Sequence, residues 1–410
     1  MAGTRRPRPA APLAVPSRHR PRSRARRRAP RPPHRNGKLG RAARRTDDLT
    51  TTRDETIRAF LASSGWGEAT RRPLAGDAST RRYERLSLNG RPAVLMDWPS
   101  GPDAPVTAGR AAYSRIAHLA EDVRAFVAVG EHLRGLGLSA PEIYAADIAQ
   151  GLLLLEDLGD DVYGTLIEQG AGPAGEPLDA LYRAGIETLL RLQSAPAPAA
   201  LPVGNGEMHA VPHFDDGVFR GELDVLLDWH FPVVLGREAA TEERAEFHQC
   251  WSELRPSIDA GPATLFLRDY HSPNMLWLGA REGAARVGLI DYQDALIGSR
   301  AYDVVSFLQD ARRDVPPARE QAMRALYIER AKSELLDFDE EEFLAAYAAL
   351  GAERALRLMG LWPRLLKRDG KPQYMAHMPR TVDYLRRNLA HPALAALKTW
   401  LETHVLREHA

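Results

Sequence analysis

Two short segments of the chain carry acidic and amide side chains at a fixed spacing. Residues 267–274 read Leu-Arg-Asp-Tyr-His-Ser-Pro-Asn, and residues 288–294 read Gly-Leu-Ile-Asp-Tyr-Gln-Asp. Asp269 precedes Asn274 by five positions, and Asp291 closes an apolar run of strand type. One carboxylate that accepts or orients a hydroxyl proton, plus an amide and a second carboxylate that hold Mg²⁺, is the set needed to transfer the γ-phosphoryl group of ATP. The sequence therefore predicts a kinase.

Each of these side chains also has a structural interpretation. Asp and Asn commonly cap turns and bond loop backbone, but the second, strand-ending Asp291 favours catalysis. Asp294 is predicted either to reach the metal or to bond only the backbone of its segment. His271 is more typical of a hydrogen-bonded loop residue than of a base, because Asp269 already fills that role.

Length and composition favour a soluble fold of one or two lobes. The chain has 410 residues, of which 44% are hydrophobic, enough for a sizeable core. The longest apolar runs, such as residues 151–155, are strand-sized, whereas a membrane-spanning helix needs roughly 20 apolar residues. Cys250 is the single cysteine, which excludes an intrachain disulfide and indicates a reducing cytoplasm.

The charge is divided unevenly along the chain. Residues 1–45 hold 15 Arg, one Lys, eight Pro and no acid, which leaves 39 of the 55 basic residues against 54 acidic ones, a net charge of −15. Such an acidic body argues against nucleic-acid binding by the fold. Residues 1–48 are predicted to be a disordered Arg- and Pro-rich tail. A nucleic-acid arm, a targeting peptide and a start site assigned too far upstream are the alternatives.

The segment before residue 160 is predicted to be a small lobe rich in strands. A helical period begins near Asp54, and strands are expected over 72–74, 82–88 and 91–98. Asn89 and Gly90 predict a type I′ hairpin. A small-residue loop between the first two strands includes Ser79 and Thr80, whose hydroxyl groups are candidate phosphate donors, although such a loop is usually only a turn.

A helix over 123–133 and strands over 143–146 and 152–156 complete this lobe, and the rest is mostly helical. Residues 156–160 break the strand pattern and are predicted to connect the lobes. Backbone groups there, at Glu156 and Leu158, are candidate partners for an adenine edge. The predicted division is 52–158 for the N-lobe and 159–410 for the C-lobe, with residues 195–202 as a loop.

These motifs resemble the aminoglycoside phosphotransferase-like kinase superfamily, whose members share the protein-kinase fold. The wording of residues 268–274, 290–295, 308–315 and 369–374 is most similar to the sugar 1-kinases that act on N-acetylmuramate and N-acetylglucosamine in peptidoglycan recycling. The resemblance covers residues 52–387 and implies an α+β, protein-kinase-like two-lobe fold. Its N-lobe would be a small antiparallel sheet and its C-lobe larger and mostly helical.

The resemblance also implies roles for individual residues. Asp269 matches the catalytic-loop aspartate, and Arg268 matches the arginine of that loop. Asn274 and Asp291 match the metal-binding residues, and Asp303 matches an aspartate that braces the loop from the helical lobe. The implied cofactors are ATP and Mg²⁺. The implied partner is a small amino sugar, with no membrane and no obligate protein partner.

One position departs from the kinase pattern. Met96 stands on the strand where protein kinases carry a lysine that grips the α- and β-phosphates. Arg81 and Arg82 follow the small-residue loop, and a guanidinium offers phosphate a planar fork of donors. The sequence predicts that one of these arginines replaces the lysine. The alternative is a nucleotide-binding scaffold without turnover.

The acceptor is predicted from residue types. An amino sugar needs hydrogen-bond partners and an apolar platform, and a lactyl carboxylate needs a cation. An aminoglycoside would instead need a pocket rich in carboxylates, for which Glu222, Asp224 and Asp228 are candidates, although a solvated helix face explains them equally well. The candidates for an amino-sugar site are His271, Arg364, Lys367, Lys371 and Tyr374.

Overall fold

The computed structural model describes residues 52–74, 81–100 and 113–409. Contacts divide the chain into two units, Met1–Thr56 and Ile57–Ala410. The sheet and helices below belong to the second unit. The candidate phosphate donors Ser79 and Thr80 lie outside the described residues.

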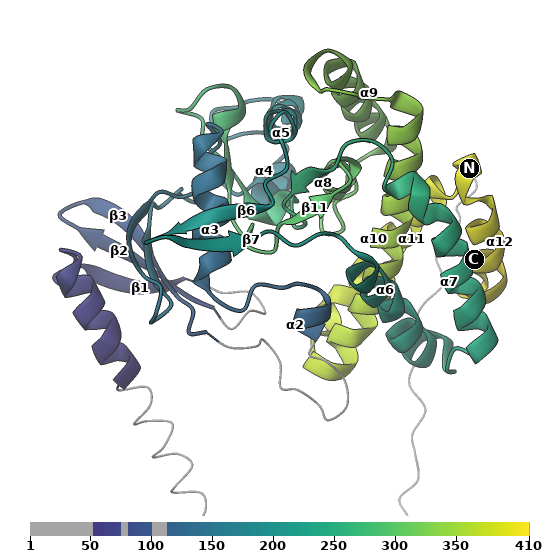
Figure 1. Cartoon of the computed structure of the whole chain (residues 1–410), viewed down its shortest axis with the longest axis horizontal. Coiled ribbons are helices and arrows are strands. Elements are labelled where there is room, and N and C mark those ends of the chain that lie inside the picture. Colours follow the sequence, from purple (N-terminus) through teal and green to yellow (C-terminus); the bar gives the residue numbers. More distant parts are fainter. Residues whose placement is uncertain (1–51, 75–80, 101–112, 410) are drawn as a thin grey trace, which may run out of the picture. The chain divides into compact units, whose positions relative to one another are not determined.

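A five-stranded antiparallel sheet forms the smaller part of this unit (Figure 1). Its strand order is β1-β2-β3-β5-β4, and its second and third strands are joined by the expected tight hairpin. Asn89 has a φ of 51° and Gly90 a φ of 80°, so both central positions have the positive φ of a type I′ turn. The strands are β1 (Thr70–Leu74), β2 (Arg82–Leu88), β3 (Arg91–Asp97), β4 (Ile143–Asp147) and β5 (Leu152–Leu155).

Both faces of the sheet are covered. Leu152 and Leu154 of β5 face a small apolar cluster with the helical residues Ile57 and Phe60, whereas Leu153 and Leu155 face the main core. Side chains alternate between the faces of a strand, so a run of four leucines fits a strand that is buried on both sides. Helix α3 (Val123–Gly135) belongs to the main core, and Asp122 caps it by accepting a 2.8 Å bond from the N–H of Arg124.

Helices form most of the larger part, as expected. The segment predicted as a loop over 195–202 is only partly one, because a strand starts at residue 200 and pairs with the next strand. The elements are α2 (Tyr113–Ile116), α4 (Tyr163–Gln169), α5 (Leu178–Gln193), β6 (Ala200–Gly204), β7 (Glu207–Ala210), α6 (Asp216–Val225), the π-helix η1 (Leu226–Leu235), α7 (Thr241–Ile258), α8 (Ala301–Leu308), α9 (Pro317–Glu334), α10 (Glu340–Asp369), α11 (Met378–Asn388) and α12 (Ala395–His404). Short 3₁₀ turns are η2 (Ser272–Asn274), η3 (Gly283–Arg286), η4 (Pro372–His377), η5 (Pro392–Leu394) and η6 (Leu406–His409).

The 30-residue helix α10 packs against α6, α7, α8, α11 and η1. Its first turn is acidic and its last turn is basic, which matches the helix dipole at each end. Asp339 caps the start by accepting a 2.8 Å bond from the N–H of Glu342, and Gly370 ends it with a φ of 64°. This helix carries three of the charged side chains around the site below.

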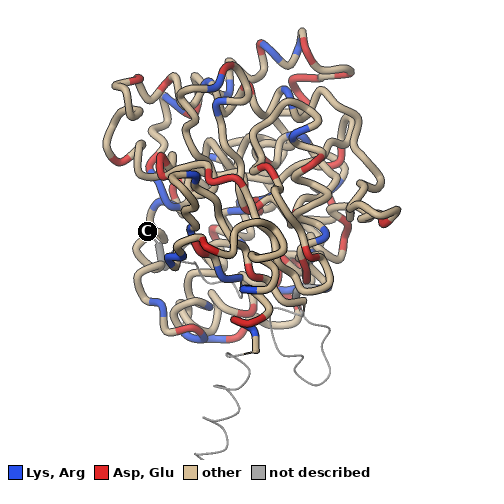
Figure 2. Tube along the Cα trace, turned by 90° about the vertical axis from the view of Figure 1, so that its left-hand side faces the viewer, with Lys and Arg blue, Asp and Glu red and all other residues tan. Residues whose placement is uncertain are grey.

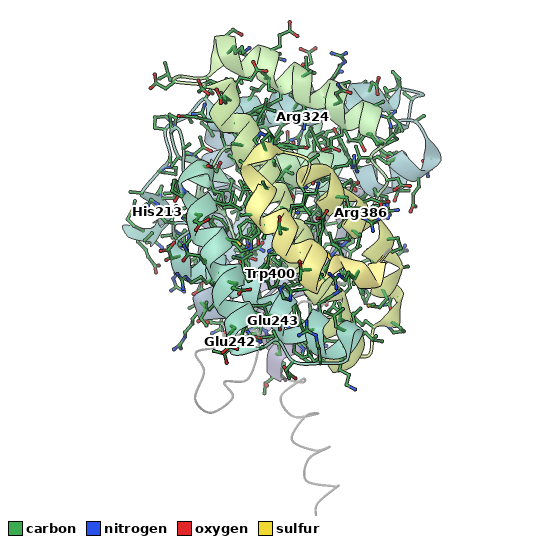
Figure 3. The ribbon with its side chains drawn as sticks, turned by 90° about the vertical axis from the view of Figure 1, so that its right-hand side faces the viewer. His213, Glu242, Glu243, Arg324, Arg386 and Trp400 are labelled. Atoms are coloured by element: carbon green, nitrogen blue, oxygen red, sulfur yellow. The ribbon has the colours of Figure 1, made fainter. Side chains whose placement is uncertain are left out.

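The C-terminal helix α12 lies against α7 (Figure 3). The Trp400 ring stacks at a tilt on Phe247, with the centroids 4.8 Å apart, and His404 is bonded to Glu243 over 2.8 Å. Basic and acidic positions are interspersed on the face drawn in Figure 2. Within the described ranges, no helix combines the length and the apolar character needed to cross a bilayer.

Close backbone packing between α10 and the α6–η1 junction depends on Gly360. A methyl group there would lie 2.2 Å from the carbonyl oxygen of Val225 and 2.7 Å from the nitrogen of Leu226. Because backbone cannot move aside cheaply, we expect Gly360→Ala to lower the free energy of unfolding by about 1–3 kcal/mol in urea titrations. Gly135→Ala is the matched control: no atom lies within 4 Å of its added carbon, and alanine favours helix. Equal unfolding midpoints for the two variants would contradict this packing.

Candidate active site

Two short strand pairs bring the two motifs together. Strand β8 (Thr264–Phe266) pairs with β11 (Leu296–Gly298), and β9 (Met275–Trp277) pairs with β10 (Val287–Leu289). Residues 267–274, hereafter the catalytic loop, join β8 to β9, and residues 290–295, hereafter the metal segment, join β10 to β11. Because both pairs are antiparallel, the ends of the two connections meet.

The three motif residues converge in space. The side-chain amide of Asn274 donates to the backbone oxygen of Asp269 over 3.1 Å and reaches Asp291 Oδ2 over 3.4 Å. The backbone N–H of Ile290 donates to the oxygen of Asn274 over 3.1 Å. Asp291 has a φ of 62°, an uncommon conformation for a residue with a side chain. One carboxylate and one amide thus lie side by side, next to the loop that carries a second carboxylate.

Asp303 holds the start of the catalytic loop through two backbone hydrogen bonds, as the resemblance implies. This buried carboxylate in the first turn of α8 accepts the N–H of Leu267 over 2.5 Å and the N–H of Arg268 over 3.0 Å. Burial raises the pKa of Asp303 to about 7. Arg268 has a φ of 70°, and its guanidinium enters the core, where it donates to the oxygen of Ala117 over 2.7 Å and to Glu222. With only 2% of the residue exposed, Arg268 is placed to position the loop.

Asp269 points the other way, and about a third of its side chain is exposed. Desolvation opposes its charge, but the guanidinium groups of Arg357, Arg268 and Arg354 favour it, and the pKa of Asp269 is lowered. Its carboxyl group is therefore ionised at neutral pH. The His271 ring nitrogen lies 3.8 Å from it, and burial lowers the pKa of His271, so this histidine is a neutral loop residue beside Asp269.

Of the two candidate arginines, Arg81 reaches the site. Its guanidinium lies 2.8 Å from Asp291 Oδ1 and 5.0 Å from the ring centre of Trp98. Arg82 is exposed. Burial disfavours the charge of Arg81, but the carboxylate of Asp291 outweighs this and raises the pKa of Arg81. Met96 is 1% exposed in the main core, so its position on β3 offers no charge to a nucleotide.

Asp294 bonds backbone rather than standing open. One of its oxygens accepts the N–H of Ala120 over 2.7 Å, and the other lies 3.3 Å from the side-chain nitrogen of Gln293. Gln293 also donates to Asp291 over 3.0 Å. Burial raises the pKa of Asp294 to about 6. The backbone group that Asp294 bonds is thus outside its own segment, unlike the one predicted, and the bond ties the metal segment to the residues before α3.

The connector after β5 lies against the strands of the site. Glu156 donates its N–H to the oxygen of Glu142 over 2.7 Å, and its carboxylate is 2.5 Å from Arg281. Leu158 packs on β10, where its Cδ1 would lie 3.1 Å from a carbon added to Gly288. Glycine on that strand therefore lets the connector approach closely.

Four of the predicted acceptor residues lie at the end of α10 and around η4, whereas His271 lies in the catalytic loop. These four are Arg364, Lys367, Lys371 and Tyr374. Tyr374 stacks on Trp362 with ring centres 5.7 Å apart, and His377 lies 5.4 Å from the same tryptophan. The pKa of Asp369 is lowered by Arg368, which bonds it, and by the nearby charges of Arg364 and Lys371, whereas Lys367 is exposed. A link toward the catalytic loop runs through Asp310, which accepts the N–H of Ser272 over 3.0 Å and whose charge is felt at His377.

Several residues of the site were not predicted from the sequence. Glu353, Arg354 and Arg357 of α10 lie around Arg268. They do so together with Glu222 of α6, which the sequence offered only as part of an aminoglycoside pocket. The available signal was a run of charges within a helix segment whose neighbours are Ala and Leu. Arg312 lies within residues 308–315, and its charge acts on both His271 and His377. The sequence did not predict this role for Arg312.

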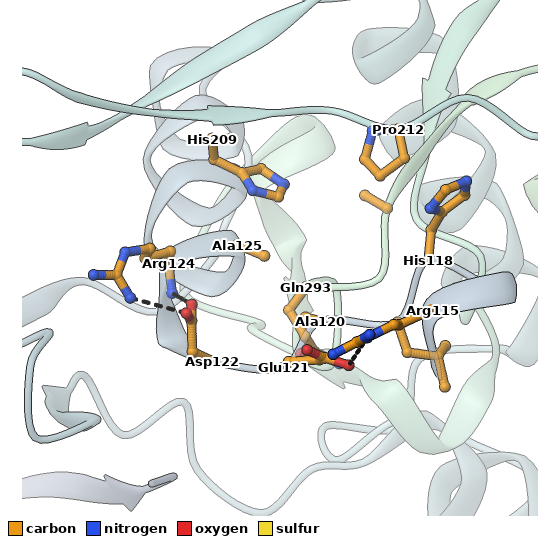
Figure 4. A pocket seen from close by; sticks show the side chains of 12 residues that line it. Arg115, His118, Ala120, Glu121, Asp122, Arg124, Ala125, His209, Pro212 and Gln293 are labelled. Carbon is orange, nitrogen blue, oxygen red and sulfur yellow. Dashed lines mark hydrogen bonds and ion pairs between the residues drawn. The ribbon is translucent and has the colours of Figure 1, made fainter. Parts of the chain in front are cut away.

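A cavity of about 380 Å³ borders the metal segment (Figure 4). Gln293 lies on its wall next to Ala120 and Glu121, which precede α3, and His209 of β7 also lines the cavity. Asp269 is not part of its lining. The other lining residues are Arg115, His118, Leu119, Ala120, Glu121, Asp122, Arg124, Ala125, Pro212 and Ala295.

The donor set fits a magnesium ion that is shared with a nucleotide. In residues 52–74, 81–100 and 113–409, no three His, Cys, Asp or Glu side chains gather to form a metal site. Asn274 and Asp291 together offer an amide oxygen and a carboxylate. Mg²⁺ commonly takes one or two protein oxygens and completes its shell with phosphates and water.

Comparisons with known proteins agree with this geometry. Residues 70–342 match the phosphotransferase enzyme family. The N-acetylmuramate/N-acetylglucosamine kinase of Caulobacter vibrioides is 40% identical over 87% of this chain and 98% of its own length. The kinase of the same name from Pseudomonas aeruginosa is 30% identical over 86% of this chain and 95% of its own.

Solved structures show the same fold. A putative aminoglycoside phosphotransferase from Ralstonia eutropha superposes with a TM-score of 0.54 at 15% identity, over 84% of this chain and 98% of its own. The α+β fold with an antiparallel sheet and a larger helical part is thereby confirmed. Since the family match spans well over half of the sequence, this chain belongs to the phosphotransferase enzyme family.

Proposed function

We propose that the protein is an ATP-dependent kinase that phosphorylates the anomeric hydroxyl of N-acetylmuramate, N-acetylglucosamine or both. The observation that carries the proposal is the convergence of Asp269, Asn274 and Asp291 at the meeting point of two strand pairs. The names of the relatives supply the acceptor. The single cysteine suits a cytoplasmic enzyme of peptidoglycan recycling that needs no membrane or protein partner.

Asp269 is proposed to orient the anomeric hydroxyl for in-line attack. The hydroxyl oxygen forms a bond to the γ-phosphorus, the bond from that phosphorus to the bridging oxygen of ADP breaks, and the hydroxyl proton passes to the Asp269 carboxylate. The lowered pKa of Asp269 keeps this carboxylate ionised. Phosphoryl transfer asks for little covalent chemistry from the protein, so positioning supplies most of the rate enhancement.

Asn274 and Asp291 would hold Mg²⁺, which neutralises charge on the β- and γ-phosphates when it is bound with ATP. Arg81 is proposed to replace the lysine that Met96 does not supply. Its guanidinium contacts Asp291 in this conformation, so it lies beside the carboxylate that would hold the metal. Glu156 and Leu158 would present backbone groups to the adenine, while Arg82, Ser79 and Thr80 remain candidate phosphate contacts.

The acceptor site is proposed to use the aromatic group near η4. Tyr374, stacked on Trp362, offers an apolar face to a sugar ring. Arg364, Lys367 and Lys371 offer cations to a lactyl carboxylate, and His271 borders the reacting hydroxyl. These residues are assigned to the acceptor because their types match the chemistry of an amino sugar.

The carboxylates considered for an aminoglycoside pocket have other partners. Glu222 is buried against Arg268 and Arg357. Asp228 lies 2.7 Å from Arg244, and Asp224 is bonded to His248 over 3.1 Å. Because these carboxylates already neutralise protein cations, they do not form an open site for a polycationic antibiotic. This observation favours the amino sugar over the aminoglycoside.

The acceptor class is tested with purified protein, ATP and Mg²⁺. We expect ADP release with N-acetylmuramate or N-acetylglucosamine and a parallel loss of the sugar's reducing power, because phosphorylation at C1 blocks the reducing end. Aminoglycosides are expected to give background ADP release. ADP release with an aminoglycoside alone would move the protein to another substrate class. Binding of ATP without ADP release, whichever acceptor is added, would identify a nucleotide-binding scaffold.

Removal of the catalytic carboxylate separates turnover from binding. Asp269→Asn is expected to lower kcat by about 10²–10⁴-fold, the usual contribution of a positioned general base, while thermal stabilisation by ATP persists. Asp228→Asn is the matched control, since this carboxylate is paired with Arg244 outside the site. Wild-type kcat in Asp269→Asn would refute the proposed chemistry.

The two arginines are compared in the same way. Arg81→Gln removes a charge-assisted contact worth about 1.5–3 kcal/mol, so we expect kcat/KM for ATP to fall by about ten- to a hundredfold. Arg82→Gln, at an exposed neighbouring position, is expected to change kcat/KM by less than about threefold. The reverse order would assign the phosphate contact to Arg82.

A further inference from the structure

Two carboxyl groups meet in the interior behind the catalytic loop. Glu222 of α6 and Glu353 of α10 are both 0% exposed. One carboxylate oxygen of Glu222 accepts bonds from Arg268 and, over 3.0 Å, from Arg357. Within the described part of the chain, the other oxygen of Glu222 and both oxygens of Glu353 are buried without a hydrogen-bond donor. Unsatisfied buried acceptors are costly and call for an explanation.

A shared proton supplies the missing donor. Two ionised carboxylates in contact would repel each other in a medium that screens charge poorly, so one of them keeps its proton. Glu222 is the ionised member, because the two guanidinium groups of Arg268 and Arg357 contact it. Glu353 is then the acid, and its O–H can point to the free oxygen of Glu222.

We propose that Glu353 is a neutral carboxylic acid that donates its proton to Glu222 and thereby positions Arg268 and the catalytic loop. The pKa directions agree with this geometry. Burial, followed by the charge of Glu222, raises the pKa of Glu353 to about 8. The pKa of Glu222 is lowered, because the charges of Arg357 and Arg268 outweigh its burial.

Other charged and titratable groups surround the pair. Arg354 of α10 lies over the Tyr302 ring of α8, with its guanidinium carbon 5.2 Å from the ring centre, and it reaches the oxygen of Arg268 over 3.4 Å. The His230 ring of η1 bonds the backbone oxygen of Met359 on α10 over 3.1 Å. Burial raises the pKa of Tyr302 above the range of Glu353. Burial also raises the pKa of Asp303 to about 7, and this carboxylate bonds the N–H of Arg268. Glu353 is therefore the group of this cluster that is expected to titrate at mildly alkaline pH.

The pair acts on the reaction through Arg268. The guanidinium of Arg268 spans Glu222 and the oxygen of Ala117, and its backbone precedes Asp269. When Glu353 loses its proton, its carboxylate repels that of Glu222. Glu222 then moves away from its contact with Arg268. The carboxylate of Asp269 then loses its fixed orientation. Glu353 is a positioning residue, since it contacts no reacting atom.

The test compares Glu353→Gln, Glu353→Leu and a control in the full-length protein. Gln keeps an N–H donor for Glu222 but cannot ionise, whereas Leu keeps much of the volume and loses the donor. Glu320→Gln is the control, because Glu320 is a buried carboxylate of α9 that bonds Gln309, Tyr347 and Arg387, away from the loop.

The first measurement is kcat against pH at saturating ATP and amino sugar, and this arm rests on the proposed function. Wild type and Glu320→Gln are expected to lose kcat above about pH 8. Glu353→Gln should keep its neutral-pH kcat within about threefold and lose this alkaline decline, whereas Glu353→Leu should lose at least about tenfold in kcat with little change in KM for ATP. An alkaline decline in Glu353→Gln like that of wild type would overturn the proposal.

The second measurement needs no substrate. Between pH 4.5, where a free glutamate titrates, and about pH 8, folded Glu353 holds a proton that the unfolded chain has lost. Stability from this group therefore falls as pH rises through that window. The melting temperature of wild type should fall more steeply with pH than that of Glu353→Gln. At pH 7 the infrared carbonyl band of protonated carboxyl groups should be weaker in the variant than in wild type.

These two arms separate the possible failures. If no amino sugar is turned over but the infrared band and the melting profile change as expected, the proposed substrate is wrong and the shared proton stands. If the sugar is turned over but neither signal changes in Glu353→Gln, Glu353 is ionised and the inference is overturned.

Discussion

The structure of the site depends first on the Asp303 carboxylate, which accepts two successive backbone N–H groups from Leu267 and Arg268. These two bonds hold the start of the catalytic loop in a conformation that includes a positive φ at Arg268. Successive side chains then separate: the Arg268 guanidinium is buried, and about a third of the Asp269 side chain stays exposed. Replacing this buried carboxylate with an apolar side chain would be costly, because both N–H groups would lose their hydrogen-bond partner.

In the proposed site, the positive charge for the phosphates comes from Arg81 and not from β3, because of how that strand is packed. Strand β3 is buried on both faces, and Met96 lies in the main core. An ammonium group there would need a carboxylate or a nucleotide for compensation at all times. Arg81 lies near the start of β2, where its side chain contacts Asp291 and the Trp98 ring. Its long, always charged side chain is paired without a nucleotide and remains within reach of one.

Features set by neighbouring residues could be predicted from the sequence, whereas features set by distant ones could not. The Asn89-Gly90 hairpin and the spacing from Asp269 to Asn274 are local. The structure confirms the turn, and the Asn274 side chain bonds the backbone oxygen of Asp269. The strand at Ala200 forms only because Ala210 lies opposite it, and composition there indicated a loop. Likewise, the exposure of Arg82 and the burial of Arg81 follow from tertiary packing that no periodicity in the sequence reveals.

A role in positioning the catalytic loop explains the buried charged cluster better than a role in stabilising the fold does. The cluster consists of Glu222, Glu353, Arg268 and Arg357. Buried ion pairs seldom stabilise a fold relative to well-packed apolar side chains, because desolvation offsets their attraction. An apolar version of this cluster would satisfy the core equally well but would give Arg268 no fixed partner. Glu222 belongs to α6 and Glu353 to α10, so their contact joins two helices to the catalytic loop through one guanidinium. In the proposed arrangement the charges specify a single orientation of the loop, which is the property that phosphoryl transfer by positioning requires.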